Sequence, residues 1–187
     1  MIKTTHIFMK KILSFGASNS INSINKKFAH YTSSLLTDLK ITNVDLNDFE
    51  VPLFGVDLEK EIGSPENAQK FNDLIESHDA LIISLAEHNS NLTAVFKNLT
   101  DWVSRLEGDT WKGKKMFLLS TSPGGRGGSG ALNIALNNFP YRGANISAHF
   151  SLPKFFENFS ASEGILDKDL RTKFLEQLEI FRKSILD

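Results

Sequence analysis

The sequence predicts an α/β fold, with a five-stranded parallel sheet covered by helices on both faces. Short apolar runs alternate with amphipathic segments along the whole chain, and this alternation is typical of parallel sheets built from right-handed crossovers. One run, residues 80–84, is almost continuously apolar, as expected of a strand buried on both faces. We favour the strand order 2-1-3-4-5, which places a ligand crevice at the carboxyl ends of strands 1 and 3.

The first half of the chain is expected to contain two strands, two helices and a long connection. Apolar residues at three- and four-residue spacing mark the inner faces of the helices. The second helix is predicted to begin at Pro65, with Ser64 as its cap. In chain order we expect a strand over 12–15, a helix face of Ile24, Phe28, Tyr31 and Leu35, a strand over 41–46, a connection over 47–64, and a helix face of Phe71, Leu74 and Ile75.

The second half continues the alternation with three strands and three helices. No linker, repeat or low-complexity block interrupts it, so we expect one domain over residues 1–187. In chain order we expect a strand over 80–84, a helix face of Leu92, Val95, Phe96, Leu99, Trp102 and Val103, a strand over 116–120, a loop over 122–130, a helix through Leu132, Ala135 and Leu136, a strand over 145–150, and a helix face of Leu170, Phe174, Leu178, Phe181 and Ile185.

Composition excludes several classes of protein. The chain has 187 residues, of which 41% are hydrophobic and 23% charged, as in ordinary globular proteins. A net charge of −1 argues against a nucleic-acid partner. The lack of cysteine excludes disulfides, thiolate metal sites and cysteine nucleophiles, and His30, His78 and His149 lack metal-ligand spacing.

No apolar run approaches the roughly 18 residues of a membrane span, and no signal peptide precedes the first strand. The sequence therefore predicts a cytoplasmic protein without a membrane partner. Residues 1–9 are interpreted either as a disordered N-terminal extension or as an over-long start assignment, since Met9 would be a natural start for a strand-first domain.

The loop after the first strand, Gly16–Asn25, is the strongest indication of a ligand site. It joins a strand to a helix start and is rich in serine and asparagine. A helix N-terminus offers unpaired N–H groups and the positive end of the helix dipole, which together bind phosphate. No Lys or Arg lies between Lys11 and Lys26, so neutral donors would hold the phosphate, unlike the lysine-containing P-loop. The alternative is a simple helix cap at Ser23 within a solvated turn.

Two further loops follow predicted strands at the same edge of the sheet, Leu85–Asn91 and Thr121–Gly130. The second of these holds five of the twelve glycines of the chain, and glycine lets backbone approach a ligand closely. Its letters 125–130 match the dinucleotide pattern G-x-G-x-x-G. That match is discounted, because it follows the fourth strand and no ribose-binding acid ends the fifth.

The three loops together resemble those of the NAD(P)H-dependent FMN reductase family of flavodoxin-like flavoproteins, over roughly residues 10–150. Ser18-Asn19-Ser20 with Ser23-Ile24-Asn25 is similar to the family's phosphate loop. Residues 86–90 with Phe96-Lys97-Asn98-Leu99-Thr100-Asp101-Trp102 resemble Pro-Glu-Tyr-Asn-Gly followed by Leu-Lys-Asn-x-x-Asp-Trp, and 120–128 resembles the strand-4 loop of one branch. The departures are Ala86, His88 and Ser90 where the family has Pro, Tyr and Gly, and a first loop without arginine.

The resemblance implies a flavodoxin-like three-layer sandwich with FMN as cofactor. Hydride would pass from NAD(P)H through FMN to a small-molecule acceptor such as flavin, quinone, azo dye or metal oxyanion, and no catalytic side chain would be required. In this interpretation, Ser18, Ser20, Ser23, Ile24 and Asn25 hold the phosphate, Glu87, His88, Asn89 and Ser90 border the ring, and Ser122, Pro123, Gly124, Gly125, Arg126 and Gly127 approach its pyrimidine side.

Several alternatives stay open from the sequence. The chain could be a flavodoxin-like electron carrier, a flavin-binding protein without turnover, or a nucleotide-binding protein without flavin. Arg126 could meet an NADPH phosphate or the acidic edge of FMN, or could be solvated. His88 could stack near the ring or face solvent.

The resemblance also implies a homodimer or homotetramer. The helix that carries Trp102 and Val103 and the loop 52–59 are the expected contacts. Trp102 could equally belong to the core, and Asp101 is expected to pair near that interface.

Overall fold

The computed structural model describes residues 9–186 and contains a five-stranded parallel sheet. The predicted extension over 1–9 lies outside this range except for Met9. The observed order β2-β1-β3-β6-β7 confirms the predicted 2-1-3-4-5 order once a small hairpin, β4–β5, is set aside. The strands are β1 (Lys11–Ala17), β2 (Lys40–Asn43), β3 (Ala80–Leu85), β6 (Lys115–Thr121) and β7 (Asn145–Leu152).

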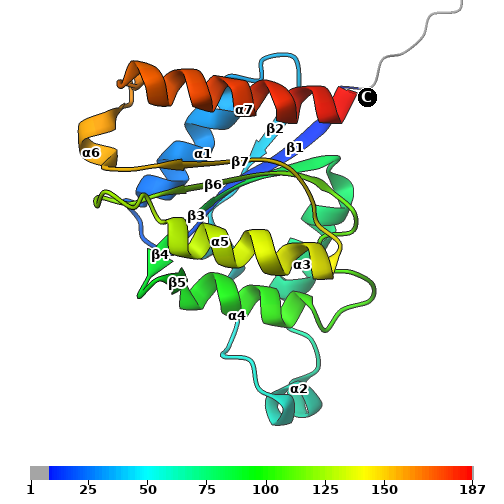
Figure 1. The fold of residues 1–187 in the computed structure, drawn as a ribbon. Coiled ribbons are helices and arrows are strands. Elements are labelled where there is room, and N and C mark those ends of the chain that lie inside the picture. The colour runs from blue at the N-terminus through cyan, green and yellow to red at the C-terminus, as the bar shows by residue number, and fades with distance from the viewer. Residues whose placement is uncertain (1–8, 187) are drawn as a thin grey trace, which may run out of the picture.

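Helices cover both faces of the sheet and complete three layers (Figure 1). The first face carries α1 and α7, and the second carries α3, α4 and α5. Every residue of β3 is buried, because its alternate side chains enter different cores. The helices are α1 (Ile24–Ser34), α3 (Glu66–Ser77), α4 (Ala94–Val103), α5 (Ser129–Asn138) and α7 (Lys168–Leu186).

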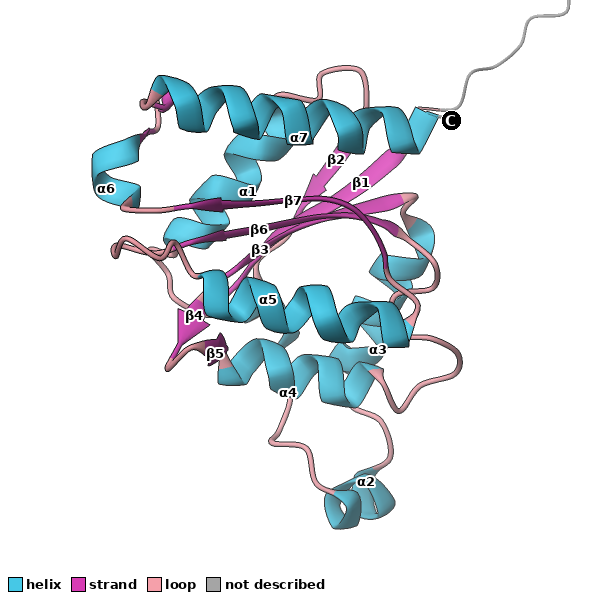
Figure 2. Cartoon of the chain, in the orientation of Figure 1, coloured by secondary structure: helices cyan, strands magenta, loops and turns pink. Residues whose placement is uncertain are grey.

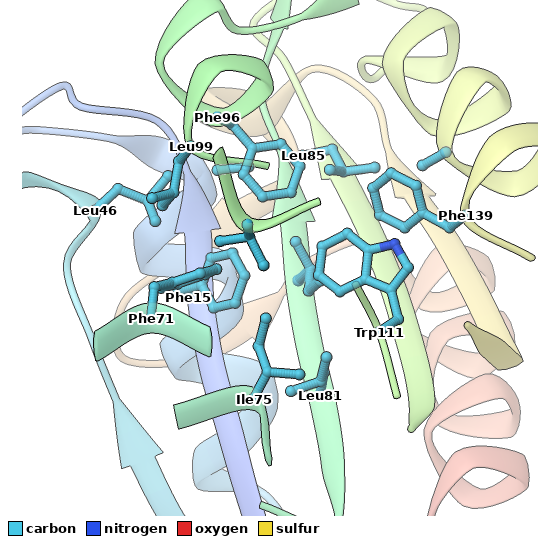
Figure 3. Packing of buried hydrophobic residues seen from close by; sticks show 14 of the residues in the cluster. Phe15, Leu46, Phe71, Ile75, Leu81, Leu85, Phe96, Leu99, Trp111 and Phe139 are labelled. Carbon is cyan, nitrogen blue, oxygen red and sulfur yellow. The ribbon is translucent and has the colours of Figure 1, made fainter. Parts of the chain in front are cut away.

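Aromatic rings fill the core beneath α3, α4 and α5 (Figure 3). Phe15 of β1 packs edge-on against Phe71 of α3, with ring centroids 5.3 Å apart. Trp111 and Phe139 form a second contact at 4.6 Å. Offset and edge-on pairs of this kind add to the stabilisation that burial alone provides.

Short elements fill the connections between the main ones (Figure 2). The hairpin β4–β5 follows β3, and α2 stands away from the sheet in Figure 1. Among residues 9–186, no helix combines the length and apolar character that a membrane span needs. The short elements are η1 (Leu46–Phe49), α2 (Val56–Ile62), β4 (Glu87–His88), β5 (Asn91–Leu92), η2 (Phe139–Arg142), α6 (Phe155–Asn158), β8 (Phe159–Ser160) and β9 (Gly164–Ile165).

Several predicted boundaries are wrong, each for a local reason. Gly16 and Ala17 belong to β1, where they pair with β3, rather than to the loop. The second strand ends at Asn43 instead of Leu46, because the Asp45 side chain accepts from the Asn47 amide and caps the turn η1. Pro65, not Ser64, is the N-cap of α3.

Gly16 sets how closely α1 approaches β1. A Cβ atom there would lie 2.6 Å from the Lys26 Cα and 2.8 Å from the Asn25 carbonyl carbon, both of them backbone atoms. Because backbone cannot yield as a side chain can, only glycine allows the first turn of α1 to rest on the end of β1.

Replacing Gly16 with alanine should therefore destabilise the protein by about 3 kcal/mol, since α1 has to move off the sheet. Urea unfolding followed by circular dichroism measures this change. Gly55→Ala is the matched control, because a Cβ at Gly55 meets nothing within 4 Å. Equal stability of the two variants would contradict the close-approach argument.

Candidate functional site

The three predicted loops meet at the carboxyl end of the sheet. β1, β3 and β6 are neighbours, so their following loops lie side by side although they are far apart in sequence. They enclose a hollow of about 250 Å³. The first loop contributes Ser18, Ser20, Asn22, Ser23, Ile24 and Asn25. The other lining residues are Ala86, Glu87 and His88 of the second loop, Thr121, Ser122 and Pro123 of the third, and Phe156 of α6.

The floor of the hollow is the N-terminus of α1. The Ser23 hydroxyl oxygen accepts from the Lys26 amide at 3.1 Å, so the capping interpretation of Ser23 is confirmed. The Ser18 hydroxyl oxygen accepts from the Ser20 amide, also at 3.1 Å. Each hydroxyl keeps its own hydrogen to donate. The amides of Ile24 and Asn25 lie in the first turn, where a helix offers no acceptor. Capping and anion binding are thus compatible here.

The Asn25 side chain ties α1 to two strands. Its Nδ2 donates to the Thr121 carbonyl at 3.1 Å, and its Oδ1 accepts from the Thr121 amide at 3.1 Å. The Ser84 hydroxyl donates to the same Oδ1 at 2.8 Å. The side chain is buried. These contacts give the Asn25 side chain a structural role. Its backbone amide, at the start of α1, is the group that can donate to a ligand.

No lysine or arginine lines this hollow within the described residues. Lys26 follows the loop, but its ammonium group pairs with the Asp45 carboxylate. Burial tends to raise the pKa of Asp45, but hydrogen bonds from Lys26 and the Asn47 amide hold that pKa below its usual value. The cation is therefore neutralised locally, and the donors that face the hollow are neutral, as the sequence predicts.

The second loop forms the hairpin β4–β5. Asn89 and Ser90 have φ angles of +50° and +60°, in the left-handed region that a tight two-residue turn requires. Serine at the second of these positions costs more than glycine would. His88, Asn89 and Ser90 are exposed. His88 lines the hollow, whereas Asn89 and Ser90 form the turn beside it.

The third loop is braced by the start of α6. The Phe155 amide donates to the Ser122 carbonyl, and the Lys154 amide donates to the Gly124 carbonyl, both at 3.0 Å. Ser122 and Pro123 line the hollow, while 124–127 turn away toward α5. Arg126 is 74% exposed and lies 3.6 Å from the Glu87 carboxylate.

Sequence reasoning missed Asn22, Ala86, Thr121 and Phe156 as lining residues. The first three lie within the predicted loops, but they were not named among the residues expected to contact the ligand. Phe156 is different: it sits on the short helix α6 and is 71% exposed. Only the contact of α6 with the third loop brings it to the rim.

Three histidines of the described range, His30, His78 and His149, lie outside the hollow. Nδ1 of His78 lies 2.7 Å from the Leu74 carbonyl, and its Nε2 lies 2.8 Å from the Thr42 hydroxyl. Burial, with the nearby Lys26 ammonium, lowers the pKa of His30. His149 is exposed on β7.

The expected interface residues on α4 lie inside the chain. Trp102 is buried, and its indole N–H donates to the Pro52 carbonyl at 2.7 Å, so the core interpretation is confirmed. Val103 is also buried. The prediction that these two side chains contact a partner is therefore wrong. Asp101 pairs with Lys97 one turn earlier on α4.

Comparison with known proteins gives a consistent result. The sequence matches the family described as NADPH-dependent FMN reductase over residues 10–157. The chain belongs to this family. Membership confirms the predicted oxidoreductase class, and it confirms FMN and NAD(P)H as the cofactors.

Named relatives of the FMN reductase chain include both sequences and solved structures. It is 30% identical over 158 residues to an uncharacterized protein of Mycoplasma pneumoniae, covering 80% of this chain and 91% of that one. It is 34% identical over 131 residues to a 2-hydroxy-1,4-benzoquinone reductase of a Burkholderia species, covering 64% and 69%. The flavoenzyme NAD(P)H:(acceptor) oxidoreductase FerB from Paracoccus denitrificans shares the fold with a TM-score of 0.75, at 24% identity over 95% of this chain and 97% of that one.

The buried Asn25 amide provides a test of how the site is held together. Asn25→Ala should lower the free energy of unfolding by about 3 kcal/mol, because the partners on Ser84 and Thr121 lose their hydrogen bonds in a buried setting. Chemical denaturation measures the change. Asn19→Ala, at an exposed position of the same loop, is the matched control. A loss below 1 kcal/mol in Asn25→Ala would refute this role.

Proposed function

We propose that this FMN reductase binds FMN in the hollow described above and passes hydride from NAD(P)H to a quinone. The observation that carries the proposal is the floor of the hollow, where the first amides of α1 and the Ser18 and Ser23 hydroxyls converge. This donor set fits a phosphate group. When bound, FMN supplies the redox chemistry by accepting a hydride and passing it on.

The phosphate end of the site would bind through neutral donors. The Ile24 and Asn25 amides point out of the first turn of α1, and the helix dipole favours an anion there. The Ser18 and Ser23 oxygens already accept one backbone N–H each, which leaves their hydrogens to donate. Ser20 adds a third hydroxyl from the exposed side. Because the Ser18 and Ser23 hydroxyls and the two helix amides are already held by backbone contacts, little reorganisation of these donors accompanies binding.

The opposite end of the hollow would hold the flavin ring between the second and third loops. Ala86, Glu87 and His88 form one wall, and Ser122 and Pro123 form the other. Exposed His88 and Phe156 stand at the rim. A planar acceptor could pack against such rings. Quinones suit this rim, and the relatives named quinone reductase in Burkholderia and Pseudomonas putida support the same acceptor class.

An active dimer belongs to the same proposal. The excursion that contains α2 exposes Leu53, Val56 and Ile62, and Leu53 is 81% exposed. Apolar side chains gathered on a projecting segment mark interaction surfaces. The side-chain amide of Asn98 and the indole N–H of Trp102, both on α4, donate to the Pro52 carbonyl. These hydrogen bonds anchor the segment where it leaves the body of the protein. A cytoplasmic location is also proposed, on the sequence alone.

Steady-state oxidation of NADPH and NADH by the purified protein, with a benzoquinone as acceptor, tests the function. An absorbance spectrum shows whether flavin is bound. Bound flavin without turnover would favour an electron carrier or a flavin-binding protein instead. A colourless protein that takes up no added FMN would exclude both the FMN-dependent enzyme and the flavin-binding alternatives.

Removing two hydroxyls locates the phosphate. Ser18→Ala combined with Ser23→Ala should raise the dissociation constant for FMN about 100-fold, because each hydrogen bond to a charged group contributes about 1.5 kcal/mol or more. Riboflavin, which has no phosphate, should bind both proteins alike. Fluorescence titration measures both ligands. Ser64→Ala with Ser162→Ala, both at exposed positions, is the control. An unchanged FMN affinity would place the phosphate elsewhere.

The dimer is tested by light scattering after size exclusion. We expect a mass about twice or four times the 20.9 kDa of one chain. Leu53→Ser with Val56→Ser should shift it toward the monomer, because the substitutions remove the exposed apolar contacts. Leu175→Ser, also at an exposed leucine but on α7, should leave the mass unchanged. A monomeric parent protein would overturn the proposal of an active dimer.

A further inference from the structure

Helix α5 begins without a cap of its own. Its N-cap is Gly128, which is in the left-handed conformation and, as a glycine, has no side chain that could accept a hydrogen bond from the helix. The first turn of a helix leaves N–H groups without intrahelical acceptors, and these are normally satisfied by a serine, threonine, aspartate or asparagine at the N-cap. Any side-chain cap for α5 therefore comes from another residue of the chain.

Glu87 supplies it from a distant part of the sequence. The Glu87 Oε2 accepts from the Ala131 amide at 3.0 Å, across 44 positions of sequence. Ala131 is the third residue of α5, where a capping side chain normally binds. The Glu87 side chain is only 10% exposed. A carboxylate placed there also meets the positive end of the helix dipole.

Gly130 makes room for this carboxylate. A Cβ atom on Gly130 would lie 2.6 Å from the Glu87 Oε2 and 2.9 Å from the Ser90 carbonyl oxygen. The hairpin β4–β5 thus rests directly on the first turn of α5. The Arg126 guanidinium lies 3.6 Å from the Glu87 Oε1, and it donates to the Ser90 hydroxyl at 3.3 Å. Arg126 therefore spans both ends of the hairpin.

We propose that Glu87 is a positioning residue, which caps α5 from the hairpin and so locks the second loop, one wall of the site, onto the helix that follows the third loop. The proposal rests on the proposed function, in that this wall faces the flavin ring. It assigns Glu87 a role distinct from contact with the cofactor. The capping contact is the dominant one, since Arg126 is largely exposed and its pairing is weak at that distance.

Loss of this capping contact should weaken the binding of FMN and riboflavin equally, unlike loss of the Ser18 and Ser23 hydroxyls, which should weaken FMN alone. Glu87→Ala should raise the dissociation constants of FMN and riboflavin by the same factor, about tenfold, because the wall faces the part that both ligands share. A tenfold change corresponds to about 1.4 kcal/mol. Glu87→Gln should stay within about threefold of the parent protein, because its amide oxygen still accepts from Ala131. Glu176→Ala, at an exposed position of α7, is the matched control.

Fluorescence titration of the flavin-free full chain with FMN and with riboflavin measures these constants. Unchanged affinity in Glu87→Ala overturns the proposal, as does a Gln variant as weak as the Ala variant. A loss confined to FMN also overturns it, because that result would assign Glu87 to the phosphate.

Amide hydrogen exchange tests the same lock without any flavin. In Glu87→Ala, the first turn of α5 and the hairpin 87–92 should exchange faster together, while α1 should remain as protected as in the parent protein. Gly130→Ala should reproduce this pattern, because its Cβ displaces the carboxylate. Unchanged exchange at either segment overturns the proposal, and this holds even if the parent protein binds no FMN.

Discussion

The site depends on the contact between the start of α1 and the end of β1. Gly16 lets the two backbones approach, and Asn25 then reaches across to β3 and β6. The close approach at Gly16 and one buried amide side chain together fix the N-terminus of α1 relative to three strand ends. A helix N-terminus binds an anion only if its amides are held in place and remain free, and this contact provides both conditions. The nearby hydroxyl of Thr93 adds a further tie, because it donates to the Ala17 carbonyl at 2.9 Å.

The electrostatics of the site follow from the same arrangement. Lys26 directly follows Asn25 in α1 but is held by Asp45, which caps η1 just after β2. The start of α1 and the loop before it therefore form a cup of neutral dipoles, and the Lys26 ammonium is turned to one side. Neutral donors distinguish a phosphate by geometry more than by charge, and their attraction for an anion falls less with added salt than that of exposed charges. Such a cup suits a cofactor held by many contacts along its length.

The second and third loops, where we propose that the flavin ring binds, are held by a different kind of contact. The turn of the hairpin and residues 123–126 are exposed. Their order comes from hydrogen bonds to the backbone: Glu87 to α5, and the amides of Lys154 and Phe155 to the third loop. Departures from the family pattern fall in this region, at Ala86, His88 and Ser90. The hydrogen bond from the Ala131 amide to Glu87, and the room that Gly130 leaves for it, do not involve the side chains at these three positions.

The sequence by itself determined the fold class, the strand order, the family and the three loops that form the site. Hydrophobic periodicity reports which face of a segment is buried, and glycine and serine composition reports where backbone must approach a ligand, so both are visible locally. These local patterns did not predict the element boundaries at Ala17, Asn43 and Glu66, because capping and strand pairing decide where those elements begin and end. The tertiary structure alone decided that Asn25 is a buried tie, that Phe156 reaches the rim, that Trp102 is internal, and that Glu87 caps α5. Each of these depends on a partner between 30 and 96 positions away, and local patterns carry no information about such partners.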